Sequence, residues 1–329
     1  MTMKLELAFS QRVGYSMYLN EMDLLLTAKA RNSGDGIGNI SFRFRSSPEF
    51  FPEVSIPMLW VGPDETVDIS SLRSAPIEPD PDFISSITER TPAVVSLEAV
   101  DSEGNVLASA SQTTYILPFN YWPGGDMPEI LASFVTPNAP SLAAVRSRAS
   151  DKLSSWKQNP SLEGYQSDNA DRVLSLGAAL YAALEELNIN YVNPPAGFER
   201  EGQRIRLSDE ALALREGTCI DLAALYASAL ESIGLNPVVF VVRGHAFAGF
   251  WLYDNWQPDI VSWDSSEFTR MIRNKAFRAV ECTMFTNGST RPFEDACTQA
   301  LLRLEDMDSF ICAVDIRASA ARYSLCRSA

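Results

Sequence analysis

Hydrophobic and polar residues alternate in several short segments across the first third of the chain. Residues Ile40-Ser-Phe-Arg-Phe-Arg45 show a period of two, which is typical of a half-buried strand. Residues 94–110 hold two apolar runs separated by the turn-forming stretch Asp101-Ser-Glu-Gly-Asn105, which predicts a hairpin. A further turn cluster occurs at 32–38. Short strands at this spacing predict an antiparallel β-sandwich of immunoglobulin-like type over residues 1–118.

The pattern changes after this region. Residues 119–160 begin with proline, glycine and aromatic residues and continue into an expected helix, so we expect them to connect two domains. Beyond them, apolar residues recur first at helical spacing and then in short runs typical of strands. The expected helices are 170–187 and 218–233, and the expected strands are 237–242 and 246–253. This succession predicts a C-terminal α+β domain over residues 161–329.

Composition narrows the classes of function. The 329 residues include 27 basic and 42 acidic ones, and this net charge of −15 argues against the phosphate backbone of a nucleic acid as a direct partner. No apolar run approaches the roughly 18–20 residues of a membrane span, and the first residues lack the apolar core of a signal peptide. The five cysteines form no CxxC pair, so a reducing cytoplasm is expected. With one histidine in the chain, we expect no metal site, and no cofactor motif is evident.

One predicted helix begins with residue types that can carry chemistry. In Arg215-Glu-Gly-Thr-Cys-Ile-Asp221, Thr218 is a good N-cap and Cys219 falls in the first turn. The unpaired N–H groups and the dipole of a helix N-terminus stabilise a thiolate, so this position predicts a lowered pKa for the Cys219 thiol. Asp221 is expected to complement the same helix terminus.

The single histidine, His245, lies on the strand expected after this helix, which would return it beside the helix start. A thiol nucleophile needs such a neighbouring base, and a third group normally orients the imidazole. Glu281 is the first candidate for that third group, because its segment is expected to form a strand that pairs with the His245 strand. Asp259 and Asp264 are the alternatives.

Other residues permit a catalytic and a structural interpretation. Gln203, upstream of Cys219, could donate to an oxyanion or could simply fix a loop. Phe247 and Trp251 could line a substrate groove, although alternating aromatic residues on a strand are more often core. Cys219 itself could be an inert packing residue.

Three short segments resemble the transglutaminase-like superfamily of papain-like cysteine enzymes. They are Gly217-Thr-Cys-Ile-Asp221, Gly244-His-Ala246 and Glu281-Cys-Thr283. The family pattern has a cysteine opening a helix, a His-Ala on the next strand and an acid in an Asp-Pro-Thr-like sequence on the strand after. Here glutamate replaces the aspartate, cysteine replaces the proline, and 261–277 would be an insertion. The resemblance implies a catalytic triad of this cysteine, histidine and glutamate, acting on amide bonds.

A longer resemblance covers most of the chain. The sequence is similar to the N-terminal part of large bacterial helicase-like proteins, in which a domain of unknown function is fused to a superfamily-one helicase and often to a nuclease. The segments that carry it are 118–124, 131–138, 162–166, 194–199 and 202–206, together with those around Cys219 and His245. This chain has no GxxxxGK[ST] phosphate loop. We therefore expect it to be a fragment or a stand-alone relative that lacks the helicase.

Two functions remain open at this point. The first is a cysteine peptidase or amidase with a protein or peptide substrate, with acyl transfer or crosslinking as the competing chemistry. The second is a non-catalytic module that recognises a partner protein and controls a helicase or nuclease in defence against phage or mobile DNA.

Overall fold

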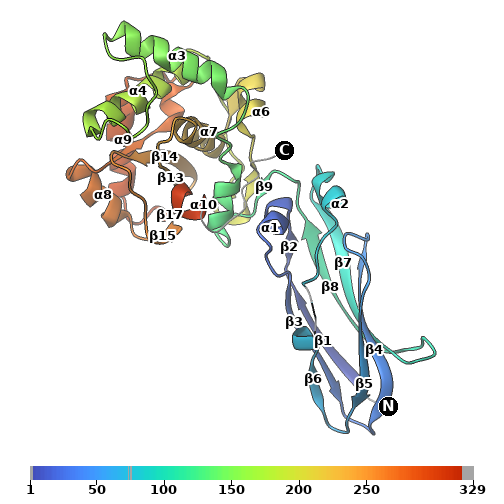
Figure 1. Ribbon diagram of the computed structural model, residues 1–329. Coiled ribbons are helices and arrows are strands. Elements are labelled where there is room, and N and C mark those ends of the chain that lie inside the picture. Colours follow the sequence, from blue (N-terminus) through green and yellow to red (C-terminus); the bar gives the residue numbers. More distant parts are fainter. Residues whose placement is uncertain (1–2, 73, 75, 321–329) are drawn as a thin grey trace. The chain divides into compact units, whose positions relative to one another are not determined.

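The computed structural model describes residues 3–72, 74 and 76–320 (Figure 1). The chain folds as two compact units, Met1–Phe119 and Asn120–Ala329. The segment 119–160, expected to be a connection, belongs to the second unit from Asn120 onward. Its helical stretches at 128–134 and 142–155 pack against other elements of that unit, which explains the difference.

The first unit contains two β-sheets, drawn in blue to cyan in Figure 1. One has the order β1-β3-β6 and the other β2-β8-β7-β4-β5, and all pairs are antiparallel except β2 with β8. The strands are β1 (Met3–Phe9), β2 (Arg12–Val13), β3 (Leu25–Asn32), β4 (Ile37–Ser47), β5 (Val54–Val61), β6 (Thr66–Asp68), β7 (Thr91–Val100) and β8 (Val106–Ile116). The helical elements are α1 (Tyr15–Leu19), η1 (Ile69–Leu72) and α2 (Pro81–Ser85).

The alternation seen in the sequence explains how these strands pack. Phe42 and Phe44 of β4 are fully buried, while Arg43 between them points to the other face and pairs with Glu98 at 3.2 Å. The expected hairpin at 94–110 lies within β7 and β8. Strand β1 also packs against β7 and β8 of the other sheet, so the two sheets share one core.

The second unit is built on a five-stranded antiparallel sheet with the order β15-β17-β13-β14-β16. Its strands are β13 (Pro237–Val242), β14 (His245–Trp251), β15 (Val261–Ser262), β16 (Phe277–Val280) and β17 (Phe310–Asp315). Every residue of β13 is buried, which explains its unbroken apolar run, Pro-Val-Val-Phe-Val-Val. Strand β13 has the bounds expected from the sequence, whereas β14 begins one residue earlier and ends two residues earlier than the expected 246–253.

Helices cover both faces of this sheet. On one face, Phe250 of β14 contacts Tyr226 of α7 (Cys219–Glu231) and lies against Gly177 of α4 (Ala170–Glu185). On the other face, Phe240 of β13 stacks on Phe247 of β14 and meets Phe268 of α8 (Ser265–Arg273) edge to face. Helix α9 (Phe293–Glu305) packs on β16 and α8. The ends of the central strands are therefore fixed between two helical layers.

The remaining elements of the second unit surround this sheet. They are β9 (Tyr121–Trp122), η2 (Pro128–Phe134), α3 (Leu142–Ser155), β10 (Asn190–Tyr191), α5 (Phe198–Glu201), β11 (Gln203–Arg204), α6 (Ser208–Leu214), β12 (Glu216–Gly217), η3 (Cys282–Phe285) and α10 (Ile316–Ala320). Among the described helices, none combines the length and the apolar character needed to cross a membrane.

Candidate functional site

The start of α7 is fixed by a capping box. Thr218 is the N-cap, and its hydroxyl accepts a hydrogen bond from the backbone N–H of Asp221 at 3.5 Å. The Asp221 carboxylate in turn accepts from the backbone N–H of Thr218 at 2.9 Å. This reciprocal arrangement satisfies N–H groups that a helix N-terminus leaves unpaired. Both Thr218 and Asp221 therefore take the roles predicted for them, and Cys219 is the first residue of the helix.

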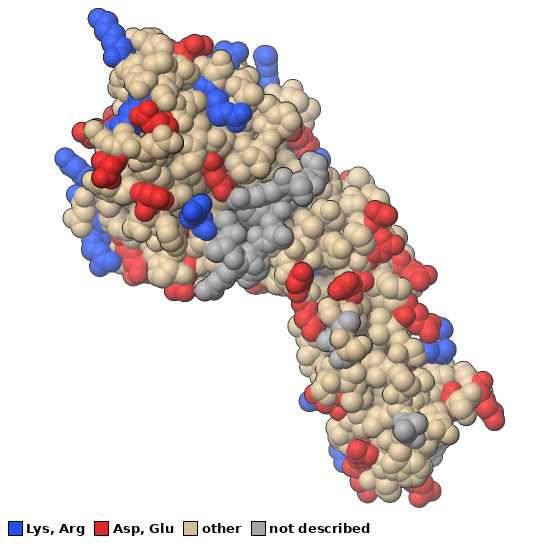
Figure 2. Space-filling view, in the orientation of Figure 1, with Lys and Arg blue, Asp and Glu red and all other residues tan. Residues whose placement is uncertain are grey.

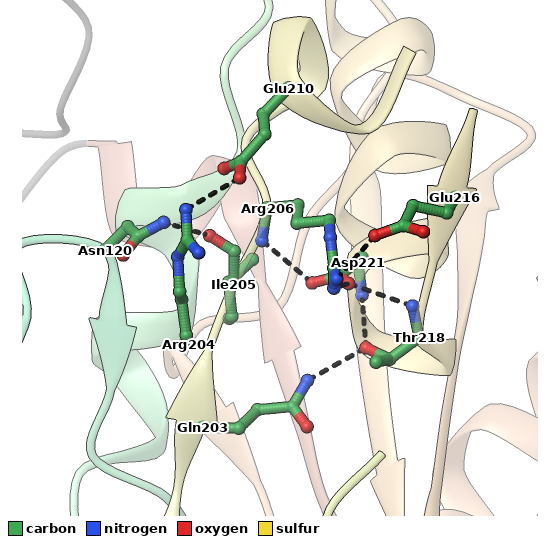
Figure 3. Close-up of polar contacts among 9 residues, drawn as sticks. All are labelled: Asn120, Gln203, Arg204, Ile205, Arg206, Glu210, Glu216, Thr218 and Asp221. Atoms are coloured by element: carbon green, nitrogen blue, oxygen red, sulfur yellow. Dashed lines mark hydrogen bonds and ion pairs between the residues drawn. The ribbon is translucent and has the colours of Figure 1, made fainter. Parts of the chain in front are cut away.

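Asp221 also ties the helix to the loop that precedes it (Figure 3). Its buried carboxylate accepts from the Arg206 backbone N–H at 2.9 Å and from the Arg206 guanidinium at 3.1 Å. The same guanidinium reaches Glu216 at 2.8 Å. Burial raises the pKa of Asp221, while the hydrogen bonds from Thr218 and Arg206 lower it. The chain on both sides of Cys219 is thus held through one carboxylate.

Gln203 lies beside this cap. It is buried on β11, and its side-chain nitrogen donates to the Thr218 hydroxyl at 2.9 Å, as Figure 3 shows. Its side-chain oxygen has no hydrogen-bond partner among the described residues. This contact is the loop-fixing role considered for Gln203, and it places the amide one residue from Cys219. Its role as an oxyanion donor stays a prediction.

The Cys219 thiol is completely buried. This burial raises the pKa of Cys219 to about 12, although the backbone N–H groups of Ala246 and Ile220 hydrogen-bond to the sulfur and lower it. The expectation of a lowered pKa at the helix N-terminus is therefore wrong for this arrangement, because desolvation of the thiolate outweighs the hydrogen bonds.

Tyr191 lies beside the thiol. Burial first, and then its interaction with Cys219, raise the pKa of Tyr191 to about 12, and the residue is 37% exposed. Tyr191 is positioned by a two-residue parallel bridge in which it lies opposite Gly217. Nothing in the sequence pattern indicates that this short strand pairs with the residues just before Cys219.

His245 and Glu281 form the second half of the site. The His245 Nε2 atom lies 2.9 and 2.8 Å from the two carboxylate oxygens of Glu281, which is 1% exposed. Thr283 donates to one of these oxygens from its hydroxyl at 2.8 Å and from its N–H at 3.2 Å. Arg303 donates to the other from Nε at 2.6 Å. Burial acts to raise the pKa of Glu281, but the contacts with His245, Arg303 and Thr283 prevail and lower it to about 2.

The sheet explains why these groups meet. Strands β14 and β16 are antiparallel neighbours with Ala248 opposite Val280, so Glu281 follows β16 at the edge where His245 begins β14. Glu281 was expected within a strand; instead β16 ends at Val280, and Glu281 is the N-cap of η3, where its side chain accepts from the Thr283 N–H. The hydrogen bond from the Ala246 N–H to the Cys219 sulfur brings the start of α7 to the same edge.

The alternative third residues lie elsewhere. Asp264 is an exposed N-cap that accepts from the Ser266 N–H at 2.8 Å at the start of α8. Asp259 is exposed in the segment before β15. Phe247 and Trp251 are core residues: Phe247 stacks on Phe240, and the Trp251 indole donates to Asp315 at 3.1 Å. Arg303, Thr283 and Tyr191 are the contacts that sequence reasoning missed.

The other cysteines give no competing site. Cys282, Cys297 and Cys312 are buried free thiols, and burial raises the pKa of each. Cys326, also present in the sequence, lies outside the described residues. Within residues 3–72, 74 and 76–320, no cluster of three or more histidine, cysteine, aspartate or glutamate residues could hold a metal ion.

Comparison with known proteins adds little to this geometry. No family model matches the chain, and no curated protein matches it. Among solved structures, a family 76 glycoside hydrolase from a bovine Bacteroides thetaiotaomicron strain aligns with a TM-score of 0.18 at 7% identity. That alignment covers 80% of this chain and 56% of the hydrolase chain. A TM-score this low supports no inference about fold or chemistry.

Proposed function

We propose that the second unit is a cysteine hydrolase that acts on amide bonds of a protein or peptide substrate. The observation that carries the proposal is the contact between the buried Glu281 carboxylate and Nε2 of His245, the single histidine of the chain. The residue after that histidine, Ala246, donates its backbone N–H to the sulfur of a cysteine at a capped helix start. A nucleophile, a base and an orienting acid in this order are the parts that acyl transfer requires.

The roles of the two ring nitrogens follow from the contacts. An ionised carboxylate only accepts hydrogen bonds, so Glu281 fixes the tautomer in which His245 Nε2 carries hydrogen. Nδ1 is then the basic nitrogen that takes the proton of the Cys219 thiol. In this mechanism the sulfur bonds to the amide carbonyl carbon, and the imidazolium gives its proton to the departing amine as the C–N bond breaks.

The acyl-enzyme is then resolved by water. His245 takes a proton from the water as its oxygen bonds to the thioester carbon, and the sulfur leaves and recovers the proton from the imidazolium. Backbone N–H groups of the first turn of α7 could donate to the oxyanion. The Gln203 amide carries a second N–H besides the one directed at Thr218 and is the side-chain candidate for this role.

The fold and the setting of the site are part of the same proposal. A cysteine opening a helix, a histidine on the next strand and a glutamate after the neighbouring strand support a transglutaminase-like fold for the second unit. The two contacting sheets of the first unit support an immunoglobulin-like sandwich. Four free thiols among the described residues support a reducing cytoplasm.

Partner classes follow from charge. On the face seen in Figure 2, Lys and Arg side chains are interspersed with Asp and Glu rather than gathered into one stripe. Together with the net charge of −15, this supports a protein or peptide partner over direct nucleic-acid binding. A helicase or nuclease protein as a partner remains a proposal that rests on the resemblance of the sequence.

The burial of Cys219 favours a second candidate function. A thiol with no exposure and a pKa near 12 suits a non-catalytic module in which the site has become structural. In that case His245 and Glu281 would act only as a buried pair that stabilises the fold. The two candidates differ in whether His245 activates the thiol.

Iodoacetamide alkylation, followed by mass spectrometry, separates the two candidates. The wild type and His245→Ala are labelled near neutral pH, with Cys297 as the internal reference because it is also buried and free. An activating imidazole makes Cys219 react at least about tenfold faster in the wild type than in the variant, while Cys297 reacts alike in both. Equal Cys219 rates in the two proteins would support the non-catalytic module.

A further inference from the structure

Arg303 makes the shortest contact to the Glu281 carboxylate. It extends from α9, on the sheet face opposite α7, and its Nε atom lies 2.6 Å from Glu281 Oε2. The same oxygen lies 2.8 Å from His245 Nε2. Thr283 donates twice to the other oxygen. One carboxylate oxygen is therefore shared between a permanent cation and the imidazole.

Resting on the proposed Cys219–His245–Glu281 site, we propose that Arg303 is a positioning residue. Its guanidinium neutralises and orients the Glu281 carboxylate, so that Glu281 can hold the His245 ring without converting the imidazole into a permanent imidazolium. Arg303 does not touch the reacting atoms and acts through Glu281.

The physical argument concerns a buried charge. A carboxylate that is 1% exposed and faces only an imidazole would favour the charged imidazolium strongly, since opposite charges within a few ångströms stabilise each other. An imidazolium held in that way cannot accept the thiol proton. The Arg303 guanidinium supplies the countercharge instead and, being a nearby cation, also disfavours a second positive charge on His245.

The geometry suits arginine in particular. The guanidinium is planar and always charged, and it can direct one N–H to the carboxylate while its remaining edge, one third exposed, stays hydrated. The groups that face Glu281 come from several elements. They are His245 of β14, Arg303 of α9, Thr283 and Cys282 of η3, Cys219 of α7, Tyr181 of α4 and Tyr191 of β10. Among these, Arg303 is the group that stays cationic at every pH at which the protein is folded.

The single histidine makes the test direct, because only one imidazole Cε1–H signal titrates in an NMR spectrum of the full chain. Arg303→Gln is expected to move this titration to a higher pH than in the wild type. Arg303→Lys is expected to give a smaller rise, because the ammonium ends farther from the carboxylate. Glu281→Gln is expected to lower the His245 pKa.

Arg273→Gln is the matched control. Arg273 is an exposed arginine on α8 that pairs with Glu305 at 2.9 Å, and its removal should leave the His245 titration unchanged. A His245 pKa in Arg303→Gln equal to that in Arg273→Gln would overturn the inference. Should Arg303→Gln not fold, an unshifted pKa in the uncharged Arg303→Met would overturn it equally.

Failure of this inference can be told apart from failure of the proposed function. If Cys219 alkylation does not depend on His245, the hydrolase proposal fails, but the His245 titration still tests whether Arg303 acts through Glu281. If alkylation depends on His245 and the His245 titration is the same with and without Arg303, only the proposed role of Arg303 fails.

Discussion

Tyr191, a residue that is 37% exposed, lies beside the completely buried Cys219 and interacts with its thiol. The strand that carries Tyr191 is held by two backbone hydrogen bonds, from the Asn190 N–H to Arg215 and from the Val192 N–H to Gly217. We therefore predict that the Tyr191 side chain limits the access of a substrate carbonyl to the sulfur.

Removal of this side chain should expose the thiol. We expect Tyr191→Ala to increase the iodoacetamide labelling rate of Cys219 by about tenfold or more, because a reagent must enter the space that the ring fills. Tyr253→Ala is a matched control, since Tyr253 is an exposed tyrosine outside this site. Equal rates in both variants would show that another element limits access to Cys219.

The stability of the protein should depend on Glu281 in acid. Burial acts to raise the pKa of this carboxyl. Its three partners, His245, Arg303 and Thr283, outweigh burial and lower the pKa from an ordinary 4.5 to about 2. A lowered folded-state pKa contributes stability that is present above about pH 4.5 and is lost as the pH falls toward about 2. We expect this component, about 3 kcal/mol in the free energy of unfolding, to be absent from the pH dependence of Glu281→Gln.

Urea denaturation at a series of acidic pH values measures this slope. Glu305→Gln is the control, since Glu305 is a half-exposed partner of Arg273 and its removal should leave the slope of the wild type intact. A Glu281→Gln protein with an unchanged slope would mean that the carboxyl is not held as the structure shows.

Within the capping box, loss of the Asp221 side chain should lower the unfolding free energy more than loss of the Thr218 side chain. Thr218→Ala removes one helix-cap hydrogen bond and also the acceptor of the buried Gln203 amide, and it is expected to cost about 1–2 kcal/mol in unfolding free energy. Asp221→Ala also leaves Arg206 without its buried partner, and a cost of about 3 kcal/mol is expected. Chemical denaturation measures both. The exposed cap at Asp264 is the reference, and Asp264→Ala should cost about 1 kcal/mol. An Asp221→Ala cost no larger than that of Asp264→Ala would contradict the bridging role of Asp221.

Two glycines near Gln203 can be compared. Both Gly197 and Gly202 have positive φ angles, 72° and 80°, but ψ is 19° at Gly197, in the left-handed helical region, and 174° at Gly202, a combination that only glycine adopts readily. A Cβ on Gly197 would meet nothing within 4 Å, whereas one on Gly202 would lie 2.1 Å from the Trp122 carbonyl oxygen. We expect Gly197→Ala to cost about 1–2 kcal/mol and Gly202→Ala clearly more, as measured by thermal unfolding. Equal losses would show that β9 and β11 can separate freely.

The sequence allowed prediction of those parts of the site that depend on local pattern. Thr218 and Asp221 follow capping rules, and β13 is identified by its unbroken run of apolar residues. Glu281 was inferred from expected strand pairing and does meet His245, although it lies just beyond the end of β16.

The rest depends on packing between segments that are distant in the chain. Arg303 reaches Glu281 from a helix on the far face of the sheet, and Tyr191 reaches Cys219 through a short parallel bridge. No periodicity in the sequence encodes either contact. The thiol pKa was mispredicted for the same reason, because burial is a property of all the segments that surround Cys219, whereas the helix-terminus rule considers only its own turn.

The two halves of the site differ in how firmly they are built. His245 and Glu281 are anchored at the ends of strands fixed between helical layers, but the segment 190–192 adjoins its neighbour through a bridge of only two residues. Substitutions in that segment would therefore alter how often the sulfur becomes accessible while the alignment of imidazole and carboxylate stays the same. The accessibility of the thiol and the alignment of His245 with Glu281 could then be changed separately, by evolution or by engineering.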